Sequence, residues 1–348
     1  MVTMFLYLLV QPASSQISEP ADTSLFIPTP IVLMPILNLS GYREQIRSVD
    51  SLLQLVLREH EVDLLTGSDL RTVLKKNRIR SNGRVNAAVA ETIRLETGYR
   101  YLMLCAVDFY TPEPVAEIAL SGRILDLNNV AIMSASSAAS SSIEHVRPFL
   151  QDAPFDKDRL TEIVVRALIR DLAVASFPAT DSGTESTGLV IVPFENGTGL
   201  VRASDIAGNI LLTTLFRSGY HVVEPGLVHE LFLSNGFLPV GEIDLVTLDQ
   251  LHELYRPDYL ITGCVEDFLS AQEGRTGEGA LFEFTTRVLE SNSGRLLAGS
   301  YHCRKGNDDE LILGIGREES TGNMMMQAIS TIPALIDSIQ LKGVAASE

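Results

Sequence analysis

The stretch GLVIVPFENGTG, from Gly188 to Gly199, decides the fold that we expect for this chain. An apolar run, Leu189–Val192, ends at a proline and a phenylalanine and then breaks into a turn rich in asparagine, threonine and glycine. A short apolar run bounded by turn-forming residues is typical of a buried β-strand. The stretch therefore predicts a strand over 189–194 that is followed by a tight turn.

The same pattern occurs earlier in the chain, where residues 29–41 read TPIVLMPILNLSG. Pro35 corresponds to Pro193 at an offset of 158 residues, and the turn asparagine and the last glycine keep the same offset. After an insertion around 270–279 the correspondence resumes at an offset of 164, which pairs RILDLNN (123–129) with RVLESNS (287–293). The chain therefore contains two copies of one unit.

A repeat of this length indicates tandem domains, because solenoid repeats are about 20–50 residues long. We expect a first domain at 29–177 and a second at 188–341, joined by a linker at 178–187. The linker sequence, PATDSGTEST, is polar and has no apolar periodicity. The length of 348 residues agrees with two domains, since a domain usually has about 100–200 residues.

Each copy is predicted to alternate strands with helices and to add a β-hairpin, an order that indicates an α/β sandwich with a mixed sheet flanked by helices. In the first copy we expect strands at 31–36, 62–65 and 101–108, helices at 46–60, from Ser68, at 84–97 and at 158–177, and a hairpin within 115–142. In the second copy we expect strands at 189–194, 220–223 and 259–267, helices from 204, from 227, at 245–255 and at 324–339, and a hairpin at 281–290 and 295–304.

The composition is that of an ordinary globular protein with a net charge of −17. Such a charge argues against nucleic acid as a partner, because binding to its backbone needs clusters of lysine and arginine. The dense basic run at 75–80 is interpreted as a solvated helix end. Three cysteines provide no disulfide framework, and we expect Cys105 and Cys264 to be buried and unbridged, since both lie in apolar strands.

The first sixteen residues, MVTMFLYLLVQPASSQ, have the features of a secretory signal peptide. A short apolar core is followed by a polar break with small residues before the cleavage position, although a positively charged start is missing. The apolar run is too short to span a bilayer, which takes about 20 residues. We therefore predict an exported, periplasmic protein that is not a transmembrane protein.

The second copy resembles a bacterial cell-envelope domain in the motifs VIVPFENGTG, GYHVVEPGLVHELF, YRPDYLITGCVEDF and RVLESNSGRLLAGS. That domain is shared by the curli-secretion protein CsgG, FlgO-like flagellar outer-membrane proteins, lipoprotein activators of penicillin-binding proteins, and the N-terminal domain of TolB. The resemblance implies an α/β fold and a role in envelope assembly. The chain departs from the family in carrying the domain twice and in lacking the lipid-bearing cysteine of many members.

The candidate ligand-binding residues are Gly197, Thr198 and Gly199, in the turn between the strand and the helix of the second copy. With Glu224 after the next strand they imitate a dinucleotide fingerprint, in which glycines let the backbone approach a phosphate. Arg202 stands at the third glycine position, so we favour a tight turn. Glycosylation at the matching Asn38 turn is discounted, because asparagine and hydroxyl side chains have a turn-forming reason to be there.

No constellation in the sequence indicates catalysis or a metal site. The six histidines show no metal-ligand spacing, and adjacent residues of a strand, such as His302 and Cys303, point to opposite faces. Acidic residues end two matching strands, at Asp108 and at Glu266-Asp267, and we interpret them as solvated strand ends. We therefore expect no catalytic residue, no cofactor and no metal.

The leading hypothesis is a non-enzymatic scaffold or assembly protein of the cell envelope, periplasmic or associated with the outer membrane, that acts through protein–protein contact. Its partners would be envelope proteins, with indirect membrane association, and a homo-oligomer is compatible with it. One alternative is a small-ligand or nucleotide-binding module that uses the Gly197–Gly199 turn. A second alternative, a lipid-free relative of pore subunits, is disfavoured because residues 280–290 alternate between one buried and one wet face.

Overall fold

The computed structural model contains two six-stranded mixed sheets, each flanked by helices. It describes residues 27–80, 82–112, 116–142, 156–174, 187–237, 243–269, 280–306, 308 and 320–347. The predicted signal peptide, all of the predicted linker except Thr187, and the insertion at 270–279 lie outside these residues. The prediction of two tandem α/β units with mixed sheets, C-terminal hairpins and flanking helices is confirmed.

The two copies have the same order of elements up to the last helix, which is divided in two in the second copy. The first comprises β1 (Ile31–Leu33), β2 (Leu37–Asn38), α1 (Glu44–Glu59), β3 (Leu64–Leu65), α2 (Gly67–Lys76), α3 (Ala87–Thr97), β4 (Tyr101–Thr111), β5 (Glu117–Asp126), β6 (Ala131–Ser141) and α4 (Lys157–Val174). The second comprises β7 (Gly188–Ile191), β8 (Glu195–Asn196), α5 (Ala203–Arg217), β9 (His221–Val222), α6 (Pro225–Ser234), α7 (Leu245–Tyr255), β10 (Tyr259–Leu269), β11 (Leu281–Glu290), β12 (Leu296–Lys305), α8 (Thr321–Ile329) and α9 (Ile332–Ser347).

The sheets share their topology and register. The strand order is β3-β1-β4-β5-β6 in the first and β9-β7-β10-β11-β12 in the second, and short strands β2 and β8 pair with β4 and β10. Ile31 pairs with Tyr101 in the first sheet, and Leu189 pairs with Tyr259 in the second. Both pairs are related by the 158-residue offset, so the repeat seen in the sequence is a repeat of strand pairing.

A β-bulge interrupts the central long strand at the same place in both sheets. The register shifts between Val107 and Phe109 in β4, and between Val265 and Asp267 in β10. The extra residues are therefore Asp108 and Glu266, which occupy equivalent positions in the repeat. A bulge bends its strand and re-aims a side chain, and it is found often near functional surfaces.

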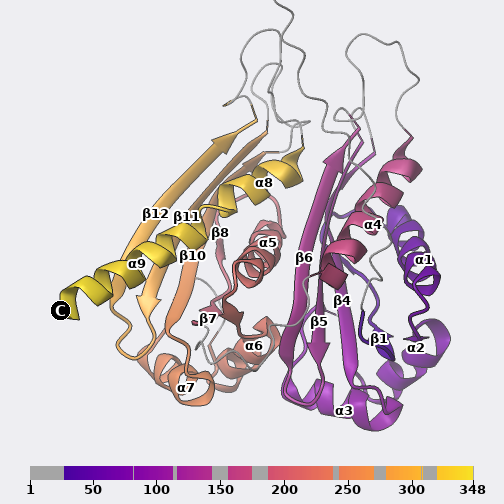
Figure 1. The fold of residues 1–348 in the computed structure, drawn as a ribbon, viewed down its shortest axis with the longest axis horizontal. Helices are drawn as coiled ribbons and strands as arrows, with labels where there is room; N and C mark the ends of the chain where they lie inside the picture. Colours follow the sequence, from indigo (N-terminus) through magenta and orange to yellow (C-terminus); the bar gives the residue numbers. More distant parts are fainter. Residues whose placement is uncertain are drawn as a thin grey trace, which may run out of the picture.

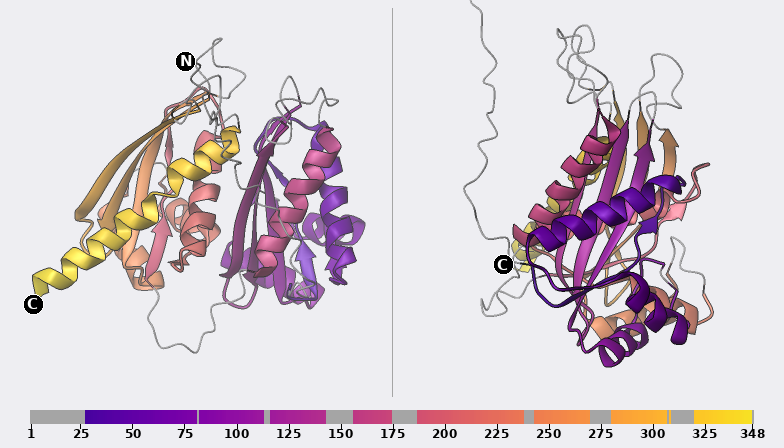
Figure 2. Two further views of the ribbon diagram at one scale, coloured as in Figure 1. Left: turned by 45° about the horizontal axis from the view of Figure 1, so that its top comes forward. Right: turned by 90° about the vertical axis from the view of Figure 1, so that its right-hand side faces the viewer.

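The two copies stack in the order helices, sheet, helices, sheet, as Figure 1 shows. Helices α1 and α4 cover the outer side of the first sheet, and α5 and α8 lie between the two sheets. Figure 2 shows the same layers from two other directions. The helical layer of the second copy thus contacts its own sheet on one side and the first copy's sheet on the other. This arrangement is head to tail, because different faces of the two copies meet.

Three groups of buried apolar residues match these layers. One lies between α1, α4 and the first sheet, with Leu53 and Leu168 at its centre. The largest joins the copies, since it contains Leu104 of the first sheet, Ile210 of α5 and Phe284 of the second sheet. A third joins the second sheet to α6 and α7 around Phe232. One continuous core therefore links the two copies.

Local signals explain most helix ends and correct two sequence predictions. Asn86 caps α3 by accepting a hydrogen bond from Val89 N at 2.8 Å. The cap predicted at Ser68 is wrong, because α2 starts one residue earlier, at Gly67, which has a φ of +68°. The single helix predicted at 324–339 is also wrong, since it divides into α8 and α9 ahead of Pro333. Proline lacks an N–H and suits the first turn of a new helix.

The serine- and alanine-rich sequence SASSAASS, residues 134–141, forms β6 and makes the stacking close. A Cβ added at Gly322 of α8 would lie 2.7 Å from Ala119 Cβ and 2.8 Å from Ala139 Cβ. One added at Gly226 of α6 would lie 2.3 Å from the carbonyl oxygen of Val85. Small residues on both sides thus let the second copy's helices approach the first copy's backbone.

Candidate functional site

The turn with the candidate residues Gly197, Thr198 and Gly199 is held by its own hydrogen bonds. The Asn196 side chain accepts from the Thr198 backbone N at 3.1 Å and from the Thr198 hydroxyl at 2.8 Å, and it donates to the Leu200 carbonyl at 2.8 Å. Leu200 N in turn donates to the Thr198 hydroxyl at 3.1 Å. The polar side chains of the turn are therefore engaged in shaping it.

The first copy repeats this network residue for residue. Asn38 accepts from the Ser40 backbone N at 3.1 Å and from the Ser40 hydroxyl at 2.8 Å, and it donates to the Tyr42 carbonyl at 3.1 Å. Tyr42 N donates to the Ser40 hydroxyl at 3.3 Å. The turn-forming role predicted for asparagine with serine or threonine is confirmed in both copies.

Gly197 packs closely against the neighbouring strand. A Cβ at this position would lie 3.1 Å from the Val265 carbonyl oxygen and 3.6 Å from Cys264 Sγ. At Gly199 an added Cβ would meet nothing within 4 Å. Gly197 therefore has a packing reason of its own, which the sequence alone does not separate from phosphate binding, and no such reason applies to Gly199.

Glu224, which the sequence places after the second strand of the fingerprint, lies at the contact between the copies. Its carboxylate accepts from Arg123 Nε and Nη2, each at 2.8 Å, and it also accepts from Gly226 N at 3.3 Å. Arg123 Nη2 further donates to the Gly83 carbonyl at 2.6 Å. Glu224 thus holds an arginine of the first copy and caps α6.

Asp108 is buried, which corrects its interpretation as a solvated strand end. The residue is 1% exposed, and its Oδ1 accepts from Asn209 Nδ2 of α5 at 2.9 Å. Burial raises the pKa of the Asp108 carboxyl to about 7, and hydrogen bonds from Asn209 and Ser121 with the charge of Arg123 oppose the rise. Glu266, at the equivalent bulge of the second sheet, is exposed as predicted. The difference arises because only the first sheet's bulge is covered by the other copy.

On the corresponding face of the second sheet, α6 and α7 cover β7 and the start of β10, while the strand residues beyond them are partly or fully exposed. We call the side chains of this exposed part the outer face. Along β11 the buried residues alternate with partly or fully exposed ones, which confirms the predicted pattern of one buried and one wet face. The outer face contains Glu266 of β10, Glu283, Thr285 and Arg287 of β11, and Tyr301, Cys303 and Lys305 of β12. Tyr301 is 59% exposed, and Leu296 at the start of β12 is 57% exposed.

Side chains of the outer face contact one another across the strands. Thr285 donates to Glu266 at 3.1 Å, and Cys303 Sγ lies 3.3 Å from Glu283 Oε1. Desolvation, followed by the contact with Glu283, raises the pKa of Tyr301 to about 12 and raises that of the Cys303 thiol. Tyr301 therefore presents a neutral phenol and Cys303 a protonated thiol at neutral pH.

Five of the seven equivalent positions in the first sheet carry small residues, and the other two are Arg123 and Asp108. At the offset of 164, Glu283 and Thr285 correspond to Ala119 and Ser121. At the same offset, Tyr301, Cys303 and Lys305 correspond to Ser137, Ala139 and Ser141. The small side chains of the first sheet let the helices of the second copy pack closely against it. The large polar side chains of the second sheet face solvent. The two copies have thus diverged on the face that makes contact between domains.

Cysteine and histidine positions complete the comparison with the sequence. Cys105 is buried as predicted, whereas Cys264 is only partly buried, and all three cysteines are free. Cys264 is less buried than predicted because its strand face is the outer face. His302 stacks on Phe284 with ring centroids 4.5 Å apart, while Cys303 is exposed, so the two side chains do point to opposite faces.

Among the residues that the structure describes, no group of three or more histidine, cysteine, aspartate or glutamate side chains is arranged to hold a metal ion. None of the helices within the same ranges is long and apolar enough to cross a membrane.

No known protein family matches the sequence, and no curated protein matches it. Among solved structures, the lipoprotein GNA1162 from Neisseria meningitidis is 19% identical, with 37% of this chain and 87% of that chain covered and a TM-score of 0.29. PelC from Paraburkholderia phytofirmans, described as a dodecamer, is 15% identical, with coverage of 43% and 87% and a TM-score of 0.30. The C-terminal domain of LpoB from Escherichia coli is 8% identical, with coverage of 35% and 85% and a TM-score of 0.25. We therefore base the proposed function on the residues of this chain.

Proposed function

We propose that the protein is a non-enzymatic scaffold of the cell envelope that binds a protein partner through the outer face of its second sheet. One observation carries this proposal. The part of the face that packs against α5 and α8 in the first copy is open in the second copy and bears mostly different side chains. A surface that makes a close domain–domain contact in the first copy is therefore exposed to solvent in the second copy.

The composition of the outer face suits a protein partner. Tyrosine and arginine are enriched at protein interfaces and often carry much of the binding energy. Tyr301 and Arg287 are both exposed here. Glu266, Glu283 and Lys305 add charges of both signs, which would set the orientation of a partner and select among partners.

Steric features disfavour a further copy of this chain as the occupant. At Gly226 and Gly322, an added Cβ would lie within 3 Å of atoms of the first copy. The corresponding residues of the first copy's helical layer are Ser68 and Asp158, both of which carry side chains. If a further copy of the chain stacked on the outer face in the same way, its Asp158 would also approach Glu283 of this chain. The head-to-tail contact is thus blocked from continuing into a filament, and the outer face remains for a different protein.

The proposed location rests on two sequence features. The N-terminal sixteen residues have the pattern of a signal peptide, and the second copy resembles the cell-envelope domain of CsgG and TolB. An assembly role at the outer membrane is the function that this resemblance implies. Export is checked by fractionating cells that produce the full chain, and retention in the cytosol would contradict it.

Site-specific photocrosslinking in the native cells tests the binding face. A photoreactive residue replaces Tyr301 in one variant and Leu55 in the control, because Leu55 is 51% exposed on α1, at the other end of the stack. We expect one crosslinked species of defined mass from position 301, lost when Arg287→Glu is added, and none from position 55. Equal crosslinking at both positions, or no dependence on Arg287, would contradict the proposal.

A further inference from the structure

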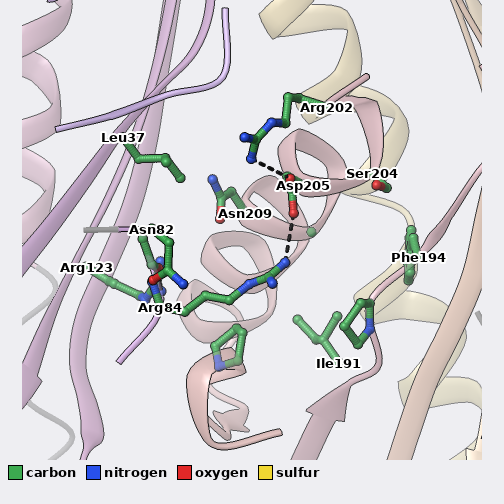
Figure 3. Close-up of a pocket in the computed structure, with 14 residues that line it drawn as sticks. Leu37, Asn82, Arg84, Arg123, Ile191, Phe194, Arg202, Ser204, Asp205 and Asn209 are labelled. Atoms are coloured by element: carbon green, nitrogen blue, oxygen red, sulfur yellow. Dashed lines mark hydrogen bonds and ion pairs between the residues drawn. The ribbon is translucent and has the colours of Figure 1, made fainter. Parts of the chain in front are cut away.

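A cavity of about 150 Å³ lies between the two copies, at the carboxyl end of β7 and the start of α5. Figure 3 shows Arg84 from the first copy and Arg202 from the second, both pointing to Asp205 from different sides of this cavity. The outside of the carboxyl ends of parallel strands is where open α/β sheets usually bind ligands. The cavity is distinct from the Gly197–Gly199 turn, whose residues do not line it within the described part of the chain.

Two guanidinium groups share one carboxylate at this place. Arg84 Nη2 donates to Asp205 Oδ1 at 2.9 Å, and Arg202 Nη1 donates to Asp205 Oδ2 at 3.3 Å. The side chains of Arg84 and Arg202 remain 30% and 50% exposed, so both are accessible from the cavity. The group Arg84, Arg202 and Asp205 therefore carries a net positive charge.

Neighbouring groups do not neutralise this positive charge. Arg123 also lines the cavity, but it is neutralised by its paired contact with Glu224. His229 Nδ1 lies 3.3 Å from Arg84 Nη1, and burial, followed by the charge of Arg84, lowers the pKa of His229. His229 is thus neutral at pH 7 and orients Arg84 without adding to the charge. The cavity is left with one positive charge in excess.

The fold itself does not require these arginines. At the equivalent start of α1 in the first copy, Glu44 stands in place of Arg202, and Arg47 stands in place of Asp205. The charges are reversed there, although the helix and the strand that precedes it are the same. Arg202 is therefore specific to the junction of the two copies.

We propose that this cavity binds a small oxyanion, a phosphate or a carboxylate group, through Arg84 and Arg202. A guanidinium presents several N–H donors in a plane and recognises carboxylate and phosphate oxygens by paired hydrogen bonds. A cavity of about this volume holds a molecule of the size of benzene, so an inorganic phosphate or a small dicarboxylate has room. Because the ligand touches residues of both copies, its binding also stabilises their stacking.

Thermal unfolding with added anions tests the site, using the whole chain. The ligands are inorganic phosphate, glycerol phosphate and succinate, and sodium chloride at equal ionic strength is the control for screening. A ligand that binds the folded state alone raises Tm in proportion to the logarithm of its concentration once the site fills. We expect such a rise with at least one of the three anions and none with chloride. No rise beyond that of chloride with any of them would overturn the proposal.

Two variants on the same helix separate binding from stability. Arg202→Gln removes one proposed ligand contact, and Arg217→Gln is the matched control, because Arg217 is similarly exposed and faces Asp171 at 3.5 Å at the other end of α5. We expect similar Tm values without ligand, and an apparent affinity for the anion about tenfold or more weaker in Arg202→Gln alone. Equal anion responses in both variants and the parent would show general ion effects and overturn the proposal.

Discussion

Arg123 of the first copy and Glu224 of the second form a buried salt bridge with two hydrogen bonds, Nε to Oε2 and Nη2 to Oε1, each 2.8 Å long. The side chains are 10% and 0% exposed. The residues are 101 positions apart in sequence and join β5 to the start of α6. The pair therefore fixes how the copies stack, and its removal affects the contact between them.

Replacing only Arg123 should be strongly destabilising. Arg123→Met leaves the Glu224 carboxylate buried without its partner, and breaking one side of a buried pair costs about 3–5 kcal/mol. The double variant with Glu224→Gln removes the uncompensated charge and should recover part of that loss. Urea unfolding measures both. The exposed pair of Lys76 and Glu96 is the control, and Lys76→Met should change stability by less than about 1 kcal/mol. A loss no larger in Arg123→Met than in Lys76→Met would contradict the structural role.

Glycines without and with room for a side chain should respond in opposite directions to alanine. Gly322→Ala places a methyl group against Ala119 and Ala139, and overpacking of this kind costs about 1–3 kcal/mol. Gly208 of α5 has nothing within 4 Å of an added Cβ, so Gly208→Ala should gain about 0.5–1 kcal/mol from helix propensity. Thermal unfolding of the two variants checks this. Equal effects would show that the helices do not pack as described.

Asp108 should make the protein less stable as the pH rises. Its pKa is raised to about 7 in the folded state, by burial, from an ordinary value near 4. Between those two values the folded state binds more protons than the unfolded state, so this group's contribution is fully present below pH 4. The contribution is lost as the pH rises through 7, by a few kcal/mol in total.

The variant Asp108→Asn isolates this contribution. An amide can still accept the hydrogen bond from Asn209 but does not ionise, so the fall in stability between pH 5 and 8 should be smaller than in the parent. Arg123 is the charged group whose attraction opposes the raised pKa, and it is unchanged in this comparison. Urea unfolding at the two pH values gives the difference. If the stability of the parent and of Asp108→Asn fell equally between pH 5 and 8, Asp108 would be ionised throughout that range, and hence solvated.

Thiol labelling should follow the order Cys303, then Cys264, then Cys105. Cys303 is exposed, but desolvation and Glu283 raise its pKa, so it should react more slowly than a free cysteine in a peptide. Cys264 is partly buried, and burial raises the pKa of Cys105 to about 12. Mass spectrometry of labelled peptides gives the order in which the cysteines react. Labelling of Cys105 before unfolding would contradict its burial in the core formed with α1 and α4.

The elements within each copy were largely predictable because their signals are local. Helix α7 was predicted with its observed ends, since Asp244 precedes an apolar periodicity and caps the helix by accepting from Val246 N at 2.9 Å. The starts of β4 and β10 at Tyr101 and Tyr259 were also predicted. The break between α8 and α9 was missed, although Pro333 was visible, because the apolar periodicity continues across it.

The contact between the copies was not predictable from local patterns. Residues 134–141 of β6 are all alanine or serine, which indicates neither a buried nor a solvated face. Their role depends on helices that come about 80–190 residues later. The burial of Asp108 was unpredictable for the same reason. A carboxylate at a strand end usually faces water, and its burial depends on the distant Asn209. The reversal of charge between Arg202 and Glu44 was available in the sequence, and it is the signal that comparison of the copies could have used.

Cleavage of the linker should leave the two copies together. We expect limited proteolysis to cut first between Phe177 and Gly188, where the sequence is polar and has no apolar periodicity. The two fragments should still elute as one species, because α5 and α8 lie in a core that both sheets share, with Arg123 bound to Glu224 across it. Size-exclusion chromatography after cleavage, with and without urea, distinguishes the outcomes. Fragments that separate in the absence of urea would show that the stacking depends on the covalent link. Early cuts within 189–220 would contradict the domain boundary itself.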